Sequence, residues 1–168
     1  MNSKLTASEI SELKSYTGSG YFNLNSKMRS CPPEFECLGK ELKEKADKIL
    51  SAIAKAGKFS TPIKVHRGLS VDQSTLKTFI DTTLKHQNDG TTYQFPSFTS
   101  TSVTSGFHGN VKFHITAKTG IFVKSLSGFK SENEVIQSPH TKYKVTEVTK
   151  SPTSHSTSST YHVNLEEV

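Results

Sequence analysis

The chain has 168 residues, a length that suits one domain built on one hydrophobic core. It is 32% hydrophobic and has no run of 18 apolar residues, which excludes a membrane-spanning helix from the expected elements. The net charge of +6 comes almost wholly from lysine, and it favours an acidic or phosphate-bearing partner. Because no basic region followed by an apolar run opens the chain, we expect no signal peptide.

The first third of the chain is predicted to be helical. A Ser/Thr-x-x-Glu capping box at residues 6–9 begins a helix that two nearby glycines are expected to end. A second short helix is expected over residues 21–29, where consecutive prolines follow. The clearest helix covers residues 35–56, because leucine and isoleucine recur there at helical spacing and a glycine comes next.

Two cysteines lie between the second and third of these helices. Cys31 and Cys37 are close enough in sequence to close a short loop, but no other cysteines exist to build a disulfide framework. We therefore predict reduced thiols. The seven histidines show no common zinc spacing, and there is no Cys-x-x-Cys pair, so no metal is expected.

From residue 61 onward the pattern changes to strands. Residues 62–68 are expected to form a strand that ends in a glycine turn, and residues 74–86 a helix. The other strand candidates alternate apolar and polar residues, and they cover residues 93–95, 98–102, 111–115, 121–123, 135–137, 143–148 and 161–165. A Ser/Thr-rich loop is expected at residues 151–160.

Helices first and strands later predict one α+β domain over residues 1–168. Its helical part covers residues 1–60 and its β-rich part residues 61–168.

Two carboxylates lie two residues apart where a polar loop passes into an apolar strand. In a strand, Glu132 and Glu134 would point to the same face, roughly 6–7 Å apart. Paired carboxylates at that range suit chemistry at a sugar carbon, where positive charge develops in the transition state. The alternative is a solvated strand end that carries two acidic residues and no chemistry.

Three motifs taken together resemble one enzyme family. Arg67 ends the first predicted strand, Ser100-Thr101-Ser102 begins 33 residues later, and Glu134 follows Ser100 by 34 residues. This order and spacing resemble the Arg, Ser-Thr-Ser, Glu-x-Glu pattern of mono-ADP-ribosyltransferases of the arginine-modifying toxin class. Residues 21–29 are also similar to the Tyr-x-x-Ile-Asn-x-x-Leu-Arg helix of that family, and the resemblance extends over residues 21–165.

The resemblance implies two facing, mostly antiparallel β-sheets that form an NAD cleft, with helices on the N-terminal side. NAD would be the co-substrate, and no metal would be needed. Arg67 would hold phosphate or ribose oxygens through its fork of donors, and Gly68 would let the backbone approach the ligand. The other residues expected to contact NAD are His66, Ser100, Thr101, Ser102, Phe107 and Glu134. Phe98 is an alternative to Phe107 for the nicotinamide contact, although a core position suits it better.

The resemblance also implies separate roles for the two acids. Loss of nicotinamide leaves an oxocarbenium-like ribose, which the carboxylate of Glu134 would stabilise. Ser100, the first serine of the family's motif, would orient that carboxylate by donating a hydrogen bond to one of its oxygens. Glu132 matches the position at which the family has Glu with arginine acceptors, and Phe129 matches an aromatic residue of its substrate-recognition loop.

The predicted function is transfer of ADP-ribose from NAD to an arginine side chain of a target protein, with release of nicotinamide. A bacterial toxin, effector or phage enzyme of this kind would act in the cytoplasm of a target or host cell. A dedicated immunity or inhibitor protein is a further expected partner. The alternatives are an NAD glycohydrolase, an ADP-ribosyltransferase with a nucleic-acid acceptor, and a basic binding module without activity. The lack of interleaved arginines and aromatics argues against the nucleic-acid acceptor.

Overall fold

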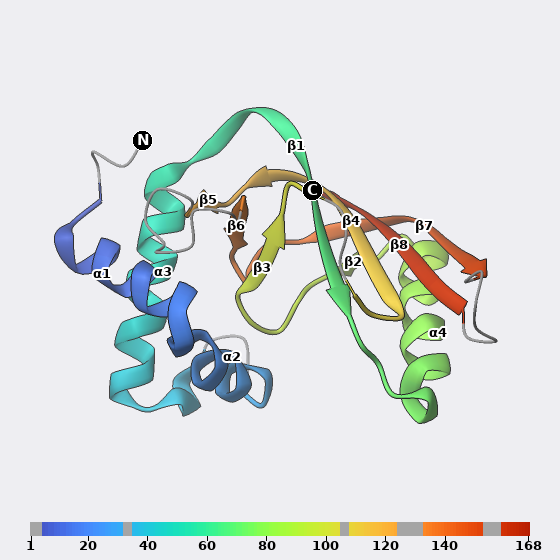
Figure 1. Cartoon of the computed structure of the whole chain (residues 1–168), viewed down its shortest axis with the longest axis horizontal. Coiled ribbons are helices and arrows are strands. Elements are labelled where there is room, and N and C mark those ends of the chain that lie inside the picture. Colours follow the sequence, from blue (N-terminus) through green and yellow to red (C-terminus); the bar gives the residue numbers. More distant parts are fainter. Residues whose placement is uncertain (1–4, 32–34, 105–107, 124–132, 153–158) are drawn as a thin grey trace. The chain divides into compact units, whose positions relative to one another are not determined.

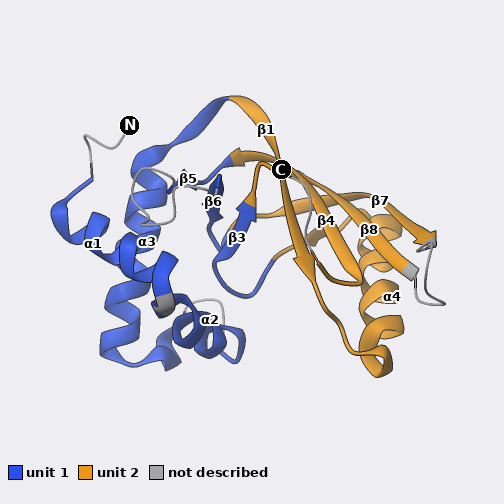
Figure 2. Cartoon of the chain, viewed as in Figure 1, with its two compact units in different colours: residues 1–60, 95–101, 119–140 blue, residues 61–94, 102–118, 141–168 orange. Residues whose placement is uncertain are grey.

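The computed structural model describes residues 5–31, 35–104, 108–123, 133–152 and 159–168, and helices precede most of the strands along the chain (Figure 1). This order confirms the predicted α+β class with N-terminal helices. The residues group into two compact units (Figure 2). Unit 1 consists of Met1–Ser60, Phe95–Thr101 and Thr119–His140, and unit 2 consists of Thr61–Gln94, Ser102–Lys118 and Thr141–Val168.

Unit 1 opens with helical segments. They are α1 (Ala7–Ser15), the π-helical turn η2 (Tyr16–Gly20), α2 (Tyr21–Arg29), the 3₁₀ turn η3 (Glu36–Leu38) and α3 (Lys40–Ala56). The predicted capping box begins α1, since the Glu9 N–H donates to Thr6 Oγ1 and the Thr6 N–H donates to the Glu9 carboxylate. The glycines expected to end this helix instead lie in η2, which continues into α2 with a kink at Gly18.

The predicted helix over residues 35–56 is divided. Phe35 has a φ of 57° and Gly39 a φ of 80°, and an α-helix contains no such backbone. The chain therefore forms only the short turn η3 before α3 starts. Gly57 has a φ of 70° and ends α3, as predicted from the glycine that follows the apolar stripe.

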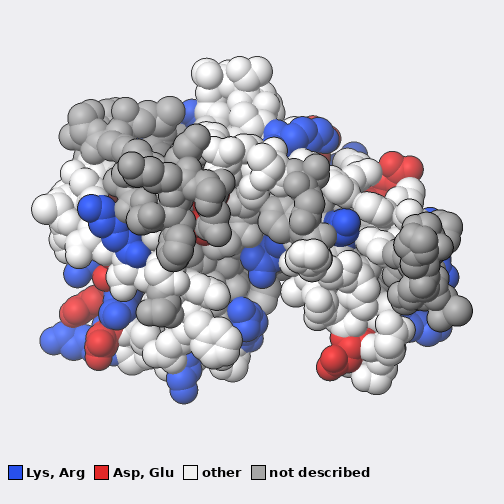
Figure 3. All heavy atoms as spheres, in the orientation of Figure 1, with Lys and Arg blue, Asp and Glu red and all other residues white. Residues whose placement is uncertain are grey.

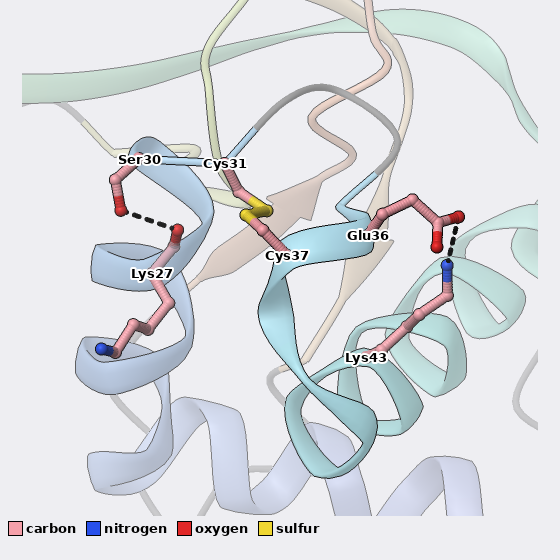
Figure 4. The surroundings of a disulfide bond; sticks show 6 residues. All are labelled: Lys27, Ser30, Cys31, Glu36, Cys37 and Lys43. Carbon is pink, nitrogen blue, oxygen red and sulfur yellow. Dashed lines mark hydrogen bonds and ion pairs between the residues drawn. A yellow bond between two sulfur atoms is a disulfide. The ribbon is translucent and has the colours of Figure 1, made fainter.

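The two cysteines form a disulfide between the end of α2 and η3 (Figure 4). The prediction of reduced thiols was therefore wrong. Six residues apart, Cys31 and Cys37 have Cα atoms only 5.8 Å from each other, whereas an extended chain of that length would span about 20 Å. The left-handed backbone at Phe35 is part of the turn that brings them together, and sequence spacing does not reveal such a turn.

The strands of unit 1 pack with its helices. β3 (Thr99–Ser102), β6 (Glu134–Gln137) and β5 (Ile121–Phe122) are neighbours in that order, and Ser102 alone of these strands belongs to unit 2. β5 and β6 are antiparallel, with Ile121 opposite Ile136. The buried core of unit 1 consists of Leu13, Tyr16, Leu24, Met28, Phe35, Leu38, Ala46, Ile49, Ala52, Ile53, Phe98, Ile121, Val123 and Ile136.

Unit 2 has a sheet with a helix on one face. It contains α4 (Gln73–Asp89), β2 (Thr92–Tyr93), β7 (Tyr143–Pro152), β8 (Ser159–Glu167) and most of β1 (Lys58–Leu69) and of β4 (Val111–Thr119). The strand order is β2-β7-β8-β4-β1, and β3 follows, where Ser102 pairs with His66. β4 and β8 are parallel, whereas β7 is antiparallel to β2 and to β8. Phe79 of α4 contacts the buried Phe113 of β4, so α4 covers that face.

The Ser/Thr-rich segment at residues 151–160 was predicted to be a loop, but its ends belong to strands. Ser151 pairs with Thr160 and Pro152 with Ser159, so β7 and β8 extend further than their hydrophobic alternation indicated. Threonine suits a strand surface as well as a turn, which explains the error. Residues 153–158 lie outside the described residues. Across the ranges that the structure describes, no helix is both long and apolar enough to cross a bilayer.

Candidate functional site

Two of the predicted site residues lie on the neighbouring strands β3 and β6 of unit 1. The Thr101 hydroxyl donates a hydrogen bond of 2.8 Å to the carbonyl oxygen of Val135, and both residues are buried. Ser100 and Glu134 are the residues immediately before these two, and both are half-buried. The structure therefore brings Ser100 and Glu134 to the same place, each one residue away from a hydrogen bond that ties the two strands together.

Ser100 also belongs to a hydrogen-bonded group that reaches into the helices. Its Oγ lies 3.5 Å from the hydroxyl of Tyr16, and Asn25 Nδ2 donates to the same hydroxyl at 2.9 Å. Tyr16 and Asn25 are both buried, and the Tyr16 ring packs edge-on against Phe98 and Tyr21. Tyr16 of η2 and Asn25 of α2 thus form a hydrogen-bonded pair, called here the polar arm, that contacts Ser100 of β3.

Sequence reasoning missed this arm. Asn25 lies in the segment that resembles the family's Tyr-x-x-Ile-Asn-x-x-Leu-Arg helix, so a signal existed for it. Tyr16 carried no signal, because only the course of η2 places its ring beside β3. Phe98, the alternative nicotinamide contact, is 1% exposed and packs on Tyr16, so it is a core residue as expected.

Arg67 lies on β1 of unit 2 and is half-buried. Burial raises the pKa of Tyr93 to about 12, while the positive charge of Arg67 acts on that phenol in the opposite direction. Gly68 follows on the same strand and is half-buried.

A cavity of about 420 Å³ lies along α4 next to Tyr93. Its walls combine threonine hydroxyls with two aromatic rings, and they consist of Val71, Thr75, Thr78, Phe79, Thr82 and Tyr93. This volume falls within the range of small-molecule sites.

His66, which was predicted to contact NAD, lies in a row with two other histidines. Its Nδ1 lies 2.9 Å from Nδ1 of His114, whose Nε2 lies 2.9 Å from Nδ1 of His162. These three rings, called here the histidine row, cross β1, β4 and β8. They alternate with the buried residues Val65 and Phe113, so they lie on the face opposite to α4. Burial lowers the pKa of His66 and of His114.

Ser102 and Thr101 have local hydrogen bonds of their own. Ser102 Oγ lies 2.9 Å from Thr104 Oγ1 and accepts the Thr104 N–H, so it holds the turn that follows β3. Thr101 is 2% exposed, and its hydroxyl donates to the Val135 carbonyl oxygen, so this side chain joins β3 to β6.

Three predicted site residues, Glu132, Phe129 and Phe107, lie outside the described residues. Within the described ranges, no three or more His, Cys, Asp or Glu side chains are grouped so as to hold a metal ion.

Comparison with known proteins identifies relatives over almost the whole chain. The model of a family described as ADP-ribosyltransferase exoenzyme matches residues 1–166. No curated protein sequence matches the chain. Among solved structures, Plx2a, an ADP-ribosyltransferase toxin from Paenibacillus larvae, is similar with a TM-score of 0.78 and 19% identity over 99% of this chain and 89% of that one.

Two further solved structures show the same fold. Exoenzyme S from Pseudomonas aeruginosa, in a complex with human 14-3-3 protein beta and bound to Carba-NAD, has a TM-score of 0.76 and 21% identity, over 98% of this chain and 75% of that one. The C3 exoenzyme of Clostridium limosum has a TM-score of 0.76 and 16% identity, over 98% of this chain and 87% of that one.

Proposed function

Because the chain belongs to the ADP-ribosyltransferase exoenzyme family, we propose that it transfers ADP-ribose from NAD to an arginine side chain of a target protein. One observation supports the proposal most directly. Ser100 and Glu134 lie on the neighbouring strands β3 and β6, each next to a residue of the hydrogen bond between Thr101 and Val135, and a serine that orients a catalytic carboxylate must lie on such a neighbouring strand or loop. The arginine acceptor rests on Glu132, two residues before Glu134.

The pyrophosphate and the adenosine end of NAD are assigned to residues of unit 2. Arg67 would hold the pyrophosphate, because its guanidinium offers paired donors in a fixed plane. The cavity along α4 would receive the adenosine end, where the rings of Phe79 and Tyr93 suit a base. That exoenzyme S binds Carba-NAD, an NAD analogue, supports NAD as the co-substrate.

In the proposed reaction, the bond between ribose C1′ and the nicotinamide nitrogen breaks, and its electron pair leaves with nicotinamide. The carboxylate of Glu134, oriented by Ser100, stabilises the positive charge left on the ribose. The target guanidinium is held by Glu132 in a charge-assisted pair, and one of its nitrogens attacks C1′. The proton released as this bond forms passes to water.

The proposal is tested by two measurements on the purified chain. Nicotinamide release is followed with and without an arginine-rich protein, and mass spectrometry locates the ADP-ribose on the acceptor. Modified arginine supports the proposal. Release without a modified acceptor would instead indicate an NAD glycohydrolase, and a failure to release nicotinamide with any acceptor would indicate a binding module.

A nucleic-acid acceptor is the remaining alternative, and DNA and RNA are included among the tested acceptors. Among the described residues on the face shown in Figure 3, Lys and Arg side chains lie scattered among uncharged and acidic ones, whereas a phosphate backbone is followed by a continuous basic stripe. The observation therefore favours a protein acceptor.

The expected place of action is the cytoplasm of a target or host cell. Exoenzyme S forms a complex with a human protein, and another structural neighbour is the ADP-ribosyltransferase HopU1 of Pseudomonas syringae pv. Tomato. By analogy, the partners proposed for this chain are a target protein with an accessible arginine and an inhibitor protein that protects the producing cell.

A further inference from the structure

One side chain ties the segment that follows β1 to the segment that precedes β4. The Val71 N–H donates to Asn110 Oδ1 at 2.8 Å, and Asn110 Nδ2 donates to the Val71 carbonyl oxygen at 2.7 Å. The carbonyl oxygen of Asn110 also accepts the N–H of Tyr161 at 2.8 Å. Asn110 therefore connects three segments of unit 2, and its amide satisfies both backbone polar groups of Val71.

The residue before Asn110 makes a second contact with the same segment. Gly109 has a φ of 131°, and a Cβ atom placed on it would lie 2.6 Å from the carbonyl oxygen of Leu69 and 2.9 Å from its nitrogen. Backbone atoms cannot move aside as a side chain can, so only glycine permits this approach. Gly109 and Asn110 together form what is called here the 109–110 clamp.

The clamp acts on the segment between Arg67 and α4. Leu69 ends β1 two residues after Arg67, and Val71 is both held by Asn110 and part of the cavity wall. α4 begins two residues later and supplies most of that wall. The separation between the guanidinium and the cavity thus depends on the turn that the clamp fixes.

We infer that Asn110, with Gly109, is a positioning residue for the binding of NAD. This inference rests on the proposed roles of Arg67 and of the cavity. Asn110 does not reach the reacting atoms through any described contact, and Ser100 and Glu134 belong to unit 1. Without the clamp, the turn would be ordered only when NAD binds. The free energy needed for this ordering should weaken the affinity for NAD and leave the rate of the chemical step unchanged.

The test compares nicotinamide release in water by the whole chain and by three variants. Asn110→Ala removes both bonds to Val71 but keeps the backbone bond to Tyr161. Its KM for NAD should rise about tenfold, with kcat within about twofold of the unchanged chain. Asn110→Asp keeps the acceptor for the Val71 N–H and loses the donor, so its KM should also rise. The matched control is Asn164→Ala, whose amide binds Glu147 elsewhere in unit 2 and whose KM should not change.

Circular dichroism and thermal unfolding establish which variants fold, and calorimetric titration with NAD measures affinity directly. If Asn110→Ala does not fold, Asn110→Asp carries the test. An unchanged KM in a folded clamp variant, or a fall in kcat alone, overturns the inference while the proposed function stands. If the unchanged chain neither binds nor cleaves NAD, the proposed function and this inference both fail.

Discussion

At the scale of single residues, the two glutamates are expected to have separable tasks. Glu134 acts on NAD, so Glu134→Gln should reduce both nicotinamide release and arginine modification by at least about 100-fold, because the charge that faces the oxocarbenium is lost. Glu132 acts on the acceptor, so Glu132→Gln should spare much of the NAD hydrolysis while arginine modification collapses. The measurement is nicotinamide release in water beside label transferred to an arginine-rich protein. Equal loss of both signals in Glu132→Gln would contradict this division.

The tyrosine that joins Asn25 to Ser100 gives a second test. Tyr16→Phe keeps the ring that packs on Phe98, so the chain should still fold, with a thermal unfolding midpoint lower by a few degrees because the buried Asn25 amide loses its acceptor. Nicotinamide release should fall by about 2- to 12-fold, the value of one net hydrogen bond. Tyr21→Phe is the matched control, since its neighbouring ring makes the same edge contact, and it should keep full activity. Unchanged release by Tyr16→Phe would show that the arm is structural only.

Site residues could be predicted from the sequence where they lie in a recognisable motif. Ser100 and Glu134 were predicted from order and spacing, and the structure sets them on adjacent strands. Tyr16 was missed because its role arises from a π-helical turn that no local pattern announces. His66 was predicted from its position beside Arg67, but sequence does not show that His114 and His162 lie across the sheet from it.

At the scale of strands and helices, the histidine row should make stability depend on pH. Burial, aided by the positive charge of Lys64, lowers the pKa of His66, and burial together with His66, His162, Lys112 and Lys64 lowers that of His114. The unfolded chain therefore binds more protons than the folded one near pH 6. The stability contributed is present above the ordinary histidine pKa of about 6.5 and is lost as the pH falls below it.

The measurement is the thermal unfolding midpoint between pH 8 and pH 5. The midpoint of the unchanged chain should fall over this range, and His114→Gln should make the fall smaller because one of the lowered groups is gone. His108→Gln is the control, since His108 is exposed and belongs to no ring contact of the row. If the midpoint of His114→Gln falls as much as that of the unchanged chain, the pH dependence of stability comes from other groups.

The disulfide predicts a redox dependence confined to one short loop. Closing a loop over a sequence separation of six should stabilise the chain by about 2 kcal/mol relative to the reduced form. Addition of a reductant should therefore lower the thermal unfolding midpoint by several degrees. The double variant with Cys31→Ser and Cys37→Ser should unfold at the lower temperature and not respond to reductant. Identical midpoints with and without reductant in the unchanged chain would contradict the expectation.

The errors at this scale have two causes. The helix predicted over residues 35–56 was interrupted by positive φ angles at Phe35 and Gly39, and a periodic apolar stripe gives no sign of them. The ends of the loop predicted at residues 151–160 belong to β7 and β8. Pairing with the other strand overrides the preference of Ser for turns there. The existence and type of α3 and β4 were predicted because their patterns reflect burial on one side, although the strand runs four residues beyond the predicted 111–115.

For the molecule as a whole, the order of elements predicted the α+β class, and the match over residues 1–166 confirms an ADP-ribosyltransferase family without specifying its arginine-modifying class. The single domain and the arginine acceptor stay predictions. The acceptor depends on Glu132 and Phe129, whose segment was assigned from the resemblance and not from periodicity.

A metal-independent reaction is the prediction that belongs to the whole molecule. Excess EDTA should leave nicotinamide release unchanged, because the proposed chemistry needs only a carboxylate, a hydroxyl and a guanidinium. Treatment with EDTA is compared with treatment with calcium-saturated EDTA, which controls for ionic strength. Loss of activity that zinc or magnesium restores would contradict the prediction.

The division into two units has a practical consequence for dissecting this protein. The chain passes from one unit to the other five times, after residues 60, 94, 101, 118 and 140. Neither unit therefore corresponds to a continuous stretch of the gene, and no single truncation can release one of them intact. The transition after residue 60 falls within β1, and the one after residue 101 within β3. A split-protein reporter or a regulatable version of this enzyme should accordingly be cut in the segment between β7 and β8, both of whose flanking strands belong to unit 2.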